Sequence, residues 1–517
     1  MTADLDTLCA EDYGSALEVL PVDAFARSRA QFDGLLGWLT SADAAALAHG
    51  ELEDCLSVDG RELLRLLLQD HLDVRAAGEV RVVAACDRDG VTRSCAEAGR
   101  SRGLVSVFGQ VTVSRIAYRS RGCSDLHPAD AILNLPAGKH SHGLRRLAAI
   151  EATRGSFDDA LAAIERCVGV GVGKRQAEQL AALAAVDFED FYAQRQPPAA
   201  AADGRAVLVI SCDGKGVVMR SEALRENTRK AAACAKTKLK TRLSKGEKPH
   251  RKRIAEVGAV YDVVPVARTV ADVIAADDAE RDAAAKPPTA ANKWLTASLV
   301  DDAATVVSKV FDEAERRDSG HQRAWVALVD GNNHQINRIQ IEAHARAIKV
   351  AIVCDFVHVV EYLWKAAWSF HDEGDPAADL WVRDHARQIL AGHATDVAAH
   401  IRDQAAHARL TAQQRRNADT AATYLTNKAP YLDYPTALAA GWPIATGVIE
   451  GACRHLVKDR MDITGARWGL QGAEAVLKLR ATISNGDLDD YWRYHLAREH
   501  HRVHTSRYAD NRVPIAA

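Results

Sequence analysis

Three acidic residues in this chain have the types and spacing expected of a site that holds divalent cations. Asp213 and Asp330 each end an apolar run and precede a glycine, in LVISCDGKG (208–216) and VALVDGNN (326–333). Glu450 lies in TGVIEGACR (446–454), where a helix is expected to begin. An apolar run that closes on Asp-Gly is typical of a buried strand with a carboxylate at its C-terminal end. Because such carboxylates bind hard cations through oxygen, the pattern indicates metal-dependent phosphoryl transfer.

Each of these acids also has a simpler interpretation. An Asp before Gly is often only a turn residue. Glu450 is equally typical of a first helical turn, where the helix dipole favours a negative charge. A fourth acid, Asp355, ends the apolar run VAIVCD (350–355) and competes with Asp330 for the middle position of the set.

The totals restrict the class of protein that carries these acids. The chain has 517 residues, 48% hydrophobic and 26% charged, which predicts more than one domain with a substantial core. Its formal net charge of −3 excludes a polycation as a whole. No long apolar run or signal peptide is visible, so we expect a soluble, cytoplasmic protein. The ten cysteines are scattered singly without Cys-x-x-Cys spacing, which predicts buried free thiols rather than a zinc ribbon.

The N-terminal part is predicted to contain three regions. Residues 1–80 have helical periodicity, and residues 81–143 form a small β-rich segment with a hairpin around Asp87–Gly90. Residues 144–195 are again helical, with a capping box at Ser156 and Asp159 and a glycine-rich break at 168–173. This helical pair is compatible with a DNA-binding helix-turn-helix and equally with a simple helical hairpin. A linker at 196–205 is the predicted main boundary.

The acids belong to the region that follows this linker. A core over 205–357 is expected to contain a strand at 206–219, a strand at 256–267, a long helix at 293–318, and strands at 325–330 and 350–355. Residues 358–440 are predicted to be an all-helical insertion, and 441–498 a closing helical region that carries Glu450. Residues 499–517 are polar and basic, and we expect a frayed tail.

A basic segment at 229–253 is the clearest electrostatic feature, since eleven of its twenty-five residues are Lys or Arg. Such a segment binds phosphates with salt-dependent affinity, or is simply a solvated loop. The side chains predicted to contact DNA are Lys236, Lys238, Lys240, Arg242, Lys245, Arg251, Lys252 and Arg253, with Lys458 and Arg467 from the closing region.

The order of these elements resembles the RNase H-like fold of DDE transposases. VCDFVH, with Asp355 and His358, is similar to the C/D-x-x-H signature that follows the second catalytic acid in several transposase superfamilies. The stretch GVIEGACRHLVKDRMDITGARWGLQGAEAVLKLRA (447–481) resembles the C-terminal motif of the ISKra group of bacterial insertion-sequence transposases. FGQVTVSRIAY and HPADAILNLP in the N-terminal half are also similar to that group. The resemblance covers about residues 60–495.

The resemblance implies an α/β fold, with an RNase H-like mixed sheet flanked by helices. An α-helical insertion precedes the catalytic Glu, and the N-terminal DNA-recognition region is α+β. Asp213, Asp330 and Glu450 would hold two Mg²⁺ ions, with Mn²⁺ as a substitute. Asp330 is preferred over Asp355 because family order puts the C/D-x-x-H element after the second acid.

Further roles are implied for neighbouring side chains. Asp355 and His358 would support the site, although His358 is as readily a core histidine. Arg454 would contact phosphate or pair with Glu450 four residues earlier. Trp468 is expected in the core, with base stacking as the alternative.

The implied function is DNA cleavage and strand transfer by an insertion-sequence transposase. Its partners would be double-stranded DNA, namely terminal inverted repeats and target DNA, and further copies of itself in a homo-oligomer. We expect no membrane partner and no nucleotide cofactor, and a cytoplasmic location at the bacterial nucleoid. Two alternatives stay open: an RNase H-like nuclease or resolvase without strand transfer, and a catalytically silent DNA-binding protein.

Overall fold

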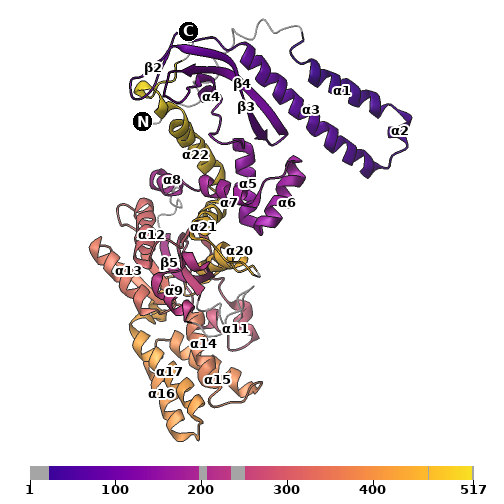
Figure 1. Cartoon of the computed structure of the whole chain (residues 1–517). Coiled ribbons are helices and arrows are strands. Elements are labelled where there is room, and N and C mark those ends of the chain that lie inside the picture. The colour runs from indigo at the N-terminus through magenta and orange to yellow at the C-terminus, as the bar shows by residue number, and fades with distance from the viewer. Residues whose placement is uncertain (1–22, 197–205, 235–250, 464, 515–517) are drawn as a thin grey trace. The chain divides into compact units, whose positions relative to one another are not determined.

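A computed structural model describes residues 23–196, 206–234, 251–463 and 465–514 (Figure 1). The chain divides into two compact units, of which the first contains residues up to Phe191 together with those from Asp489 onward. The second unit is Tyr192–Leu488. The linker predicted at 196–205 lies outside the described residues except for Gln196.

The first unit begins with helices and a pair of β-hairpins. The helices expected from periodicity before residue 80 are present as α1 (Ala26–Leu39), α2 (Ala42–Ala45) and α3 (His49–Ala77). The hairpin predicted around Asp87–Gly90 pairs β1 (Ala85–Cys86) with β2 (Thr92–Arg93). A longer antiparallel hairpin follows, formed by β3 (Cys95–Ser106) and β4 (Gly109–Arg119).

Five helices complete the N-terminal part of this unit: α4 (Pro128–Ile132), α5 (His142–Arg154), α6 (Phe157–Val168), α7 (Lys174–Ala184) and α8 (Phe188–Gln194). The Ser156–Asp159 capping box begins α6, and the main-chain N–H of Asp159 donates to Ser156 Oγ at 3.1 Å. Gly169, at φ 71°, ends that helix in the left-handed conformation. Helices α5, α6 and α7 bury a shared apolar core, so the predicted helical pair belongs to a three-helix cluster.

The C-terminal residues return to the first unit and are ordered. They form α22 (Leu488–Val503), η5 (Thr505–Arg507) and η6 (Ala509–Asn511). Tyr508 is 3% exposed in a core with Ile116, Tyr118 and Leu126, and it pairs with Asp87 in a β-bridge. The expectation of a frayed tail is therefore wrong for 499–514. The polar composition of this segment was misleading, because its charged side chains have buried partners; Glu499, for example, pairs with Arg145 at 3.3 Å.

The second unit is built on a five-stranded mixed sheet with the order β7-β6-β5-β8-β9. The strands are β5 (Val207–Val218), β6 (Lys252–Val263), β7 (Ala290–Ser298), β8 (Trp325–Val329) and β9 (Val350–Cys354). The β5–β6 and β6–β7 pairs are antiparallel, whereas β8 is parallel to β5 and β9 is parallel to β8. An α/β unit with a mixed sheet was predicted, and this general class is confirmed.

Two details of the sheet differ from the prediction. The helix expected at 293–318 begins only at Ala303, because 290–298 form β7, which pairs with β6. The run WLTAS is buried throughout, so its short apolar pattern did not distinguish a strand from a buried helix. In addition, β5 continues through Asp213 and Gly214 to Val218, as the strand predicted at 206–219 does, whereas the Asp213 carboxylate was expected at the C-terminal end of a strand.

Helices surround this sheet and form the predicted all-helical block. The helices that connect the strands are η1 (Ser221–Ala223), α9 (Glu226–Ala233), α10 (Val270–Val273), α11 (Asp278–Ala283), α12 (Ala303–Arg317) and α13 (Asn333–Ala345), of which α12 and α13 pack on the sheet. The block consists of α14 (Phe356–Ala367), α15 (Pro376–Leu390), α16 (Ala394–His407), α17 (Ala412–Lys428), η3 (Ala429–Tyr431) and α18 (Tyr434–Ala439). The closing region contains α19 (Gly447–Ala452), a π-helical turn η4 (Cys453–Lys458), α20 (Asp459–Met461) and α21 (Leu470–Ser484). No helix among the described residues is long and apolar enough to cross a membrane.

Candidate metal centre

Three aspartates are related by the register of neighbouring strands: Asp213 lies within β5, and Asp330 and Asp355 directly follow β8 and β9. Ser211 of β5 is in register with Leu328 of β8, and Val329 of β8 is in register with Cys354 of β9. Continuing this register by two residues and by one brings Asp213, Asp330 and Asp355 into a row. Asp330 and Asp355 each lie one residue past the end of their strand, so this row is an extension of the observed pairing.

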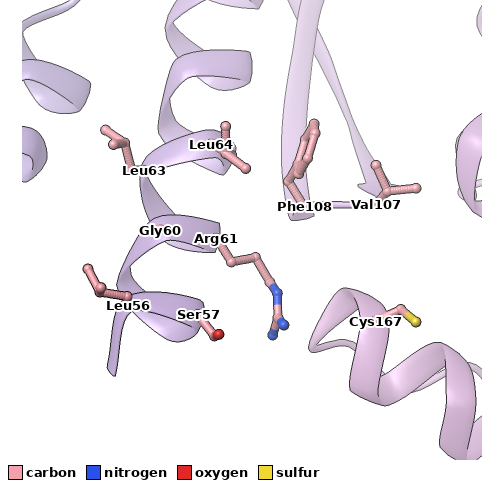
Figure 2. A pocket seen from close by; sticks show the side chains of 9 residues that line it. All are labelled: Leu56, Ser57, Gly60, Arg61, Leu63, Leu64, Val107, Phe108 and Cys167. Atoms are coloured by element: carbon pink, nitrogen blue, oxygen red, sulfur yellow. The ribbon is translucent and has the colours of Figure 1, made fainter. Parts of the chain in front are cut away.

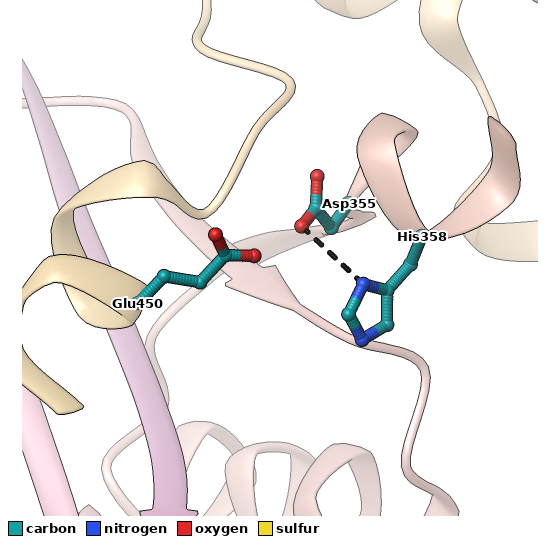
Figure 3. A group of neighbouring side chains, drawn as sticks. All are labelled: Asp355, His358 and Glu450. Atoms are coloured by element: carbon teal, nitrogen blue, oxygen red, sulfur yellow. Dashed lines mark ion pairs between the residues drawn. The ribbon is translucent and has the colours of Figure 1, made fainter. Parts of the chain in front are cut away.

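Glu450 meets the last member of this row from another element. One carboxylate oxygen of Asp355, one of Glu450 and a ring nitrogen of His358 lie within 4.8 Å of one another. Figure 3 shows Glu450 extending from its helix toward Asp355, with the His358 ring beside the same carboxylate. The distance from His358 Nδ1 to Asp355 Oδ2 is 3.9 Å. The structure therefore joins Glu450 to the C/D-x-x-H element.

Thr446 links the two carboxylates of this group. Its hydroxyl contacts Asp355 Oδ2 and lies 3.1 Å from Glu450 Oε1. Asp355 has no exposed surface, because it sits at the junction of β9 and α14 as the N-cap of that helix. Its Oδ1 accepts from the main-chain N–H of Val357 at 2.9 Å. Both oxygens of Asp355 are thus already engaged as hydrogen-bond acceptors.

The electrostatics of this group favour the binding of a cation. Burial raises the pKa of Asp355, and the charge of Glu450 raises it further, against hydrogen bonds from Thr446 and Val357 and the nearby His358. Among the described residues, neither Asp355 nor Glu450 forms an ion pair with Arg or Lys. His358 Nδ1 is buried and has no hydrogen-bond partner among the described residues. Oxygen ligands that repel one another and have no Arg or Lys partner suit a hard divalent ion.

Asp213 is connected to the Glu450 helix through a cysteine. Its Oδ2 accepts from Cys453 Sγ at 3.2 Å, and its Oδ1 accepts from the main-chain N–H of Gly214 at 2.6 Å. Burial and the charge of Asp213 raise the pKa of the Cys453 thiol, which stays protonated and acts as the donor. Cys453 follows Glu450 by three residues, so one turn of helix faces both Asp213 and Asp355.

Asp330 lies just beyond β8 and is half-buried. Its Oδ1 accepts from the main-chain N–H of Asn332 at 2.8 Å, in the turn that leads into α13. It does not belong to the close group of Asp355, His358 and Glu450. The strand register nevertheless puts it between Asp213 and Asp355. Asp330 and Asp355 thus both remain candidates for the second metal-binding acid, and they differ in that Asp330 is half-buried and Asp355 fully buried.

The residues predicted to contact DNA are only partly described. Lys236, Lys238, Lys240, Arg242 and Lys245 lie outside the described residues. Lys252 is exposed at the first position of β6, and Arg251 donates to Ser221 Oγ at 3.0 Å. Arg253 donates to the carbonyl of Leu299 at 2.6 Å, and burial lowers its pKa. Arg253 is therefore bound to the protein main chain beside the sheet.

The closing region differs from a regular helix. Because Cys453–Lys458 is π-helical, Arg454 and Lys458 do not follow Glu450 at the regular step that places them on its face. Arg454 pairs with Asp459 at 3.9 Å rather than with Glu450, and the side chains of Arg454, Lys458 and Arg467 are exposed. Trp468 is 6% exposed, with the guanidinium of Arg460 4.6 Å above its ring. Trp468 thus belongs to the core, the alternative that its sequence context favoured.

Sequence reasoning missed Thr446 and Cys453, although both occur in the motif that contains Glu450. They lie four residues before and three residues after this acid, spacings that place side chains on one face of a helix. A search of that face for polar side chains would have found them.

The first unit contains a hollow that is separate from these acids. Its volume is about 680 Å³, and Figure 2 shows its lining from α3, the β3–β4 turn and the end of α6. The lining residues are Leu56, Ser57, Gly60, Arg61, Leu63, Leu64, Val107, Phe108 and Cys167. None of the predicted site residues takes part in it.

The chain matches no protein-family model, and no curated protein matches its sequence.

Proposed function

We propose that this protein is a DDE transposase that cleaves and joins DNA in a metal-dependent reaction. The observation that carries the proposal is the row of Asp213, Asp330 and Asp355 across three strands, with Glu450 directed at it from a late helix. Burial raises the pKa of Asp355 in this group, and buried acids with a perturbed pKa are concentrated at functional sites.

The sheet supports the same proposal. An order in which two antiparallel strands lie on one side of the first strand and two parallel strands on the other fits an RNase H-like fold. The all-helical block between Asp355 and Glu450 fits the insertion expected in this superfamily. Together with the motifs around Asp355 and Glu450, these features favour a member of the ISKra group.

Asp213, Asp330 and Glu450 are the proposed metal ligands. Two Mg²⁺ ions, or Mn²⁺ in their place, would activate the attacking oxygen and stabilise the leaving oxygen of an in-line displacement at phosphorus. Asp330 is favoured over Asp355 as the second ligand, because it is half-buried and its Oδ2 accepts no hydrogen bond from the described residues. Asp355 is fully buried with both oxygens occupied, which suits a supporting role.

The supporting residues act on Glu450 and on the charge of the site. Thr446 bridges Asp355 and Glu450, and it thereby orients the Glu450 carboxylate. His358 lies beside Asp355, and its Nδ1 is within 4.0 Å of both Asp355 Oδ2 and Glu361 Oε2, where it would support the carboxylates near the reacting phosphate. Preorganised groups of this kind lower the barrier by positioning and by charge stabilisation.

The proposed substrates are the terminal inverted repeats of the element and target DNA. The basic segment at 229–253 would bind their phosphates, with affinity that falls as salt rises. Replacing its lysines and arginines by glutamine should weaken DNA binding and flatten the dependence on salt. An unchanged slope would remove the segment from the DNA interface. Since two element ends must be joined, we propose a homo-oligomer on DNA.

The decisive experiment uses the full chain with Mn²⁺ and a duplex taken from the DNA that flanks the reading frame. We expect nicking and a joined product, both lost in Asp213→Asn, Asp330→Asn and Glu450→Gln at unchanged DNA affinity. Asp355→Asn should retain part of the activity. Asp375→Asn is a matched control, because Asp375 is an exposed helix N-cap that accepts from Ala377 at 2.9 Å.

Each alternative has its own outcome in this experiment. Nicking without a joined product would favour a nuclease or resolvase. DNA binding without any Mn²⁺-dependent nicking would favour a catalytically silent DNA-binding protein. If Asp330→Asn cleaves normally and Asp355→Asn does not, the assignment of the second acid is wrong.

A further inference from the structure

The helical block that separates Asp355 from Glu450 in sequence contains two tyrosines whose hydroxyls contact the ends of β8 and β9. Tyr424, in the last part of α17, donates from Oη to the carbonyl oxygen of Asp330 at 3.3 Å. Tyr434, at the start of α18, has no exposed surface and donates to the carbonyl oxygen of Cys354 at 3.0 Å. One acceptor is thus the carbonyl of Asp330 itself, and the other belongs to Cys354, the residue before Asp355.

The glycine after Asp330 accommodates the first of these contacts. Gly331 has φ +92°, and a Cβ at this position would lie 2.8 Å from Tyr424 Oη and 3.1 Å from Cε2 of the same ring. Any side chain there would push the phenol away from the Asp330 carbonyl. The Asp-Gly pair at the end of β8 is thus matched to a tyrosine that follows it by almost a hundred residues.

Further contacts hold the Tyr424 ring in place. Tyr424 stacks on Tyr362 of α14 with ring centroids 4.0 Å apart and an angle of 16° between the planes. The Tyr424 hydroxyl also interacts with the Cys354 thiol, so it bridges the ends of β8 and β9. Lys428, one turn later and 6% exposed, donates to Asn333 Oδ1 at the start of α13. Burial raises the pKa of Tyr424, which remains a protonated donor.

We propose that Tyr424 and Tyr434 are positioning residues, through which the helical block fixes the main chain at Asp330 and Asp355 and thereby sets the geometry of the metal ligands. This inference rests on the proposed function, because it assigns a task to the helical block within that same site. A carboxylate on a fixed main chain loses less rotational freedom when it binds an ion, so the loss of either hydroxyl should weaken metal binding.

The test measures Mn²⁺ affinity of the full chain by electron paramagnetic resonance, without DNA. Tyr424→Phe and Tyr434→Phe should each raise the Kd for Mn²⁺ by about threefold to tenfold, the equivalent of one buried hydrogen bond. Tyr431→Phe is the matched control, since the hydroxyl of Tyr431 in the same block accepts from Gln340 Nε2 at 3.1 Å. Its Kd should stay within about twofold of the wild type.

Thermal unfolding without metal separates positioning from general stability. A purely structural role would lower the melting temperature of the tyrosine variants and leave the Kd unchanged, which would overturn the inference. Gly331→Ala provides a second test of the same contact, because the added Cβ should weaken Mn²⁺ binding. Tyr424→Phe removes the nearest clashing atom, so combining the two substitutions should restore part of the Mn²⁺ affinity lost in Gly331→Ala. Additive effects of the two substitutions would contradict the geometry. If the wild-type chain binds no Mn²⁺ at all, the proposed function itself fails.

Discussion

Replacing Asp355 by asparagine should stabilise the metal-free protein, contrary to the usual effect of changing a buried residue. The wild-type carboxylate has no exposed surface, lies within 4.8 Å of a Glu450 oxygen and forms no ion pair with Arg or Lys among the described residues. Two unit charges about 5 Å apart repel each other by roughly 3 kcal/mol at an effective dielectric constant of about 20. Because Glu450 is exposed, solvent screening reduces this to about 1–2 kcal/mol.

Asparagine keeps the hydrogen bonds that hold the site. Its Oδ1 still accepts from the Val357 N–H as an N-cap, and its Nδ2 donates to the Thr446 hydroxyl. That hydroxyl then donates to Glu450 Oε1. The substitution therefore removes the repulsion and keeps both contacts of the carboxylate, and the free energy of unfolding should rise by about 1–2 kcal/mol.

Urea unfolding without metal, followed by circular dichroism, measures this change. The gain should depend on pH in a defined direction. The pKa of Asp355 is raised in the folded state above its ordinary value of 3.8. Folding thus favours the protonated form, and the wild type loses stability as pH rises through the raised pKa. The difference between variant and wild type should be small near pH 4 and grow toward pH 7.

The control is Asp375→Asn, which changes another aspartate N-cap whose side chain is 42% exposed. Its stability should stay within about 0.5 kcal/mol of the wild type. If Asp355→Asn unfolds at lower urea than the wild type while Asp375→Asn does not, the carboxylate is stabilising in the folded protein. The reasoning about a charge held for a cation would then be refuted.

Three further outcomes are expected. At about pH 8, iodoacetamide should leave the buried thiols of Cys212, Cys354 and Cys453 unmodified, because burial raises the pKa of each thiol. Peptide mapping should find the label first on the exposed Cys95, Cys167 and Cys234. Arg323→Met should lower the free energy of unfolding by about 3–5 kcal/mol, because it leaves the buried Asp262 carboxylate without the guanidinium that contacts it at 2.6 Å. Arg281→Met, which breaks an exposed ion pair, should have little effect. Trp468→Ala should cost about 3–5 kcal/mol of stability in urea unfolding, as expected of a core indole rather than a base-stacking one.

The strands that carry the acids could be predicted because each is a short run of apolar, mostly β-branched residues. This pattern gave β5, β8 and β9 close to their observed positions. The same criterion failed for β7, whose run WLTAS carries no period that separates strand from helix. Helices were more predictable, because periodicity and capping residues such as Ser156 mark them locally.

The candidate site was predictable only in its members. Asp213, Asp330, Asp355 and Glu450 were each visible as acids at the ends of apolar runs or at a helix start. Their row depends on cross-strand register, which arises from pairing between residues far apart in sequence. The tyrosines of the helical block were not found, because nothing near Tyr424 in sequence indicates that it contacts Asp330.

The return of the C-terminal residues to the first unit has a consequence for how the chain folds during synthesis. All the residues of the second unit, 192–488, leave the ribosome before Tyr508, which completes the core around Tyr118. The unit that begins first is thus the one that is finished last. The sheet with the acid row can assemble while the first unit still lacks part of its interior, and a chain cut short after residue 488 would lose the integrity of the N-terminal unit and keep every member of the acid row.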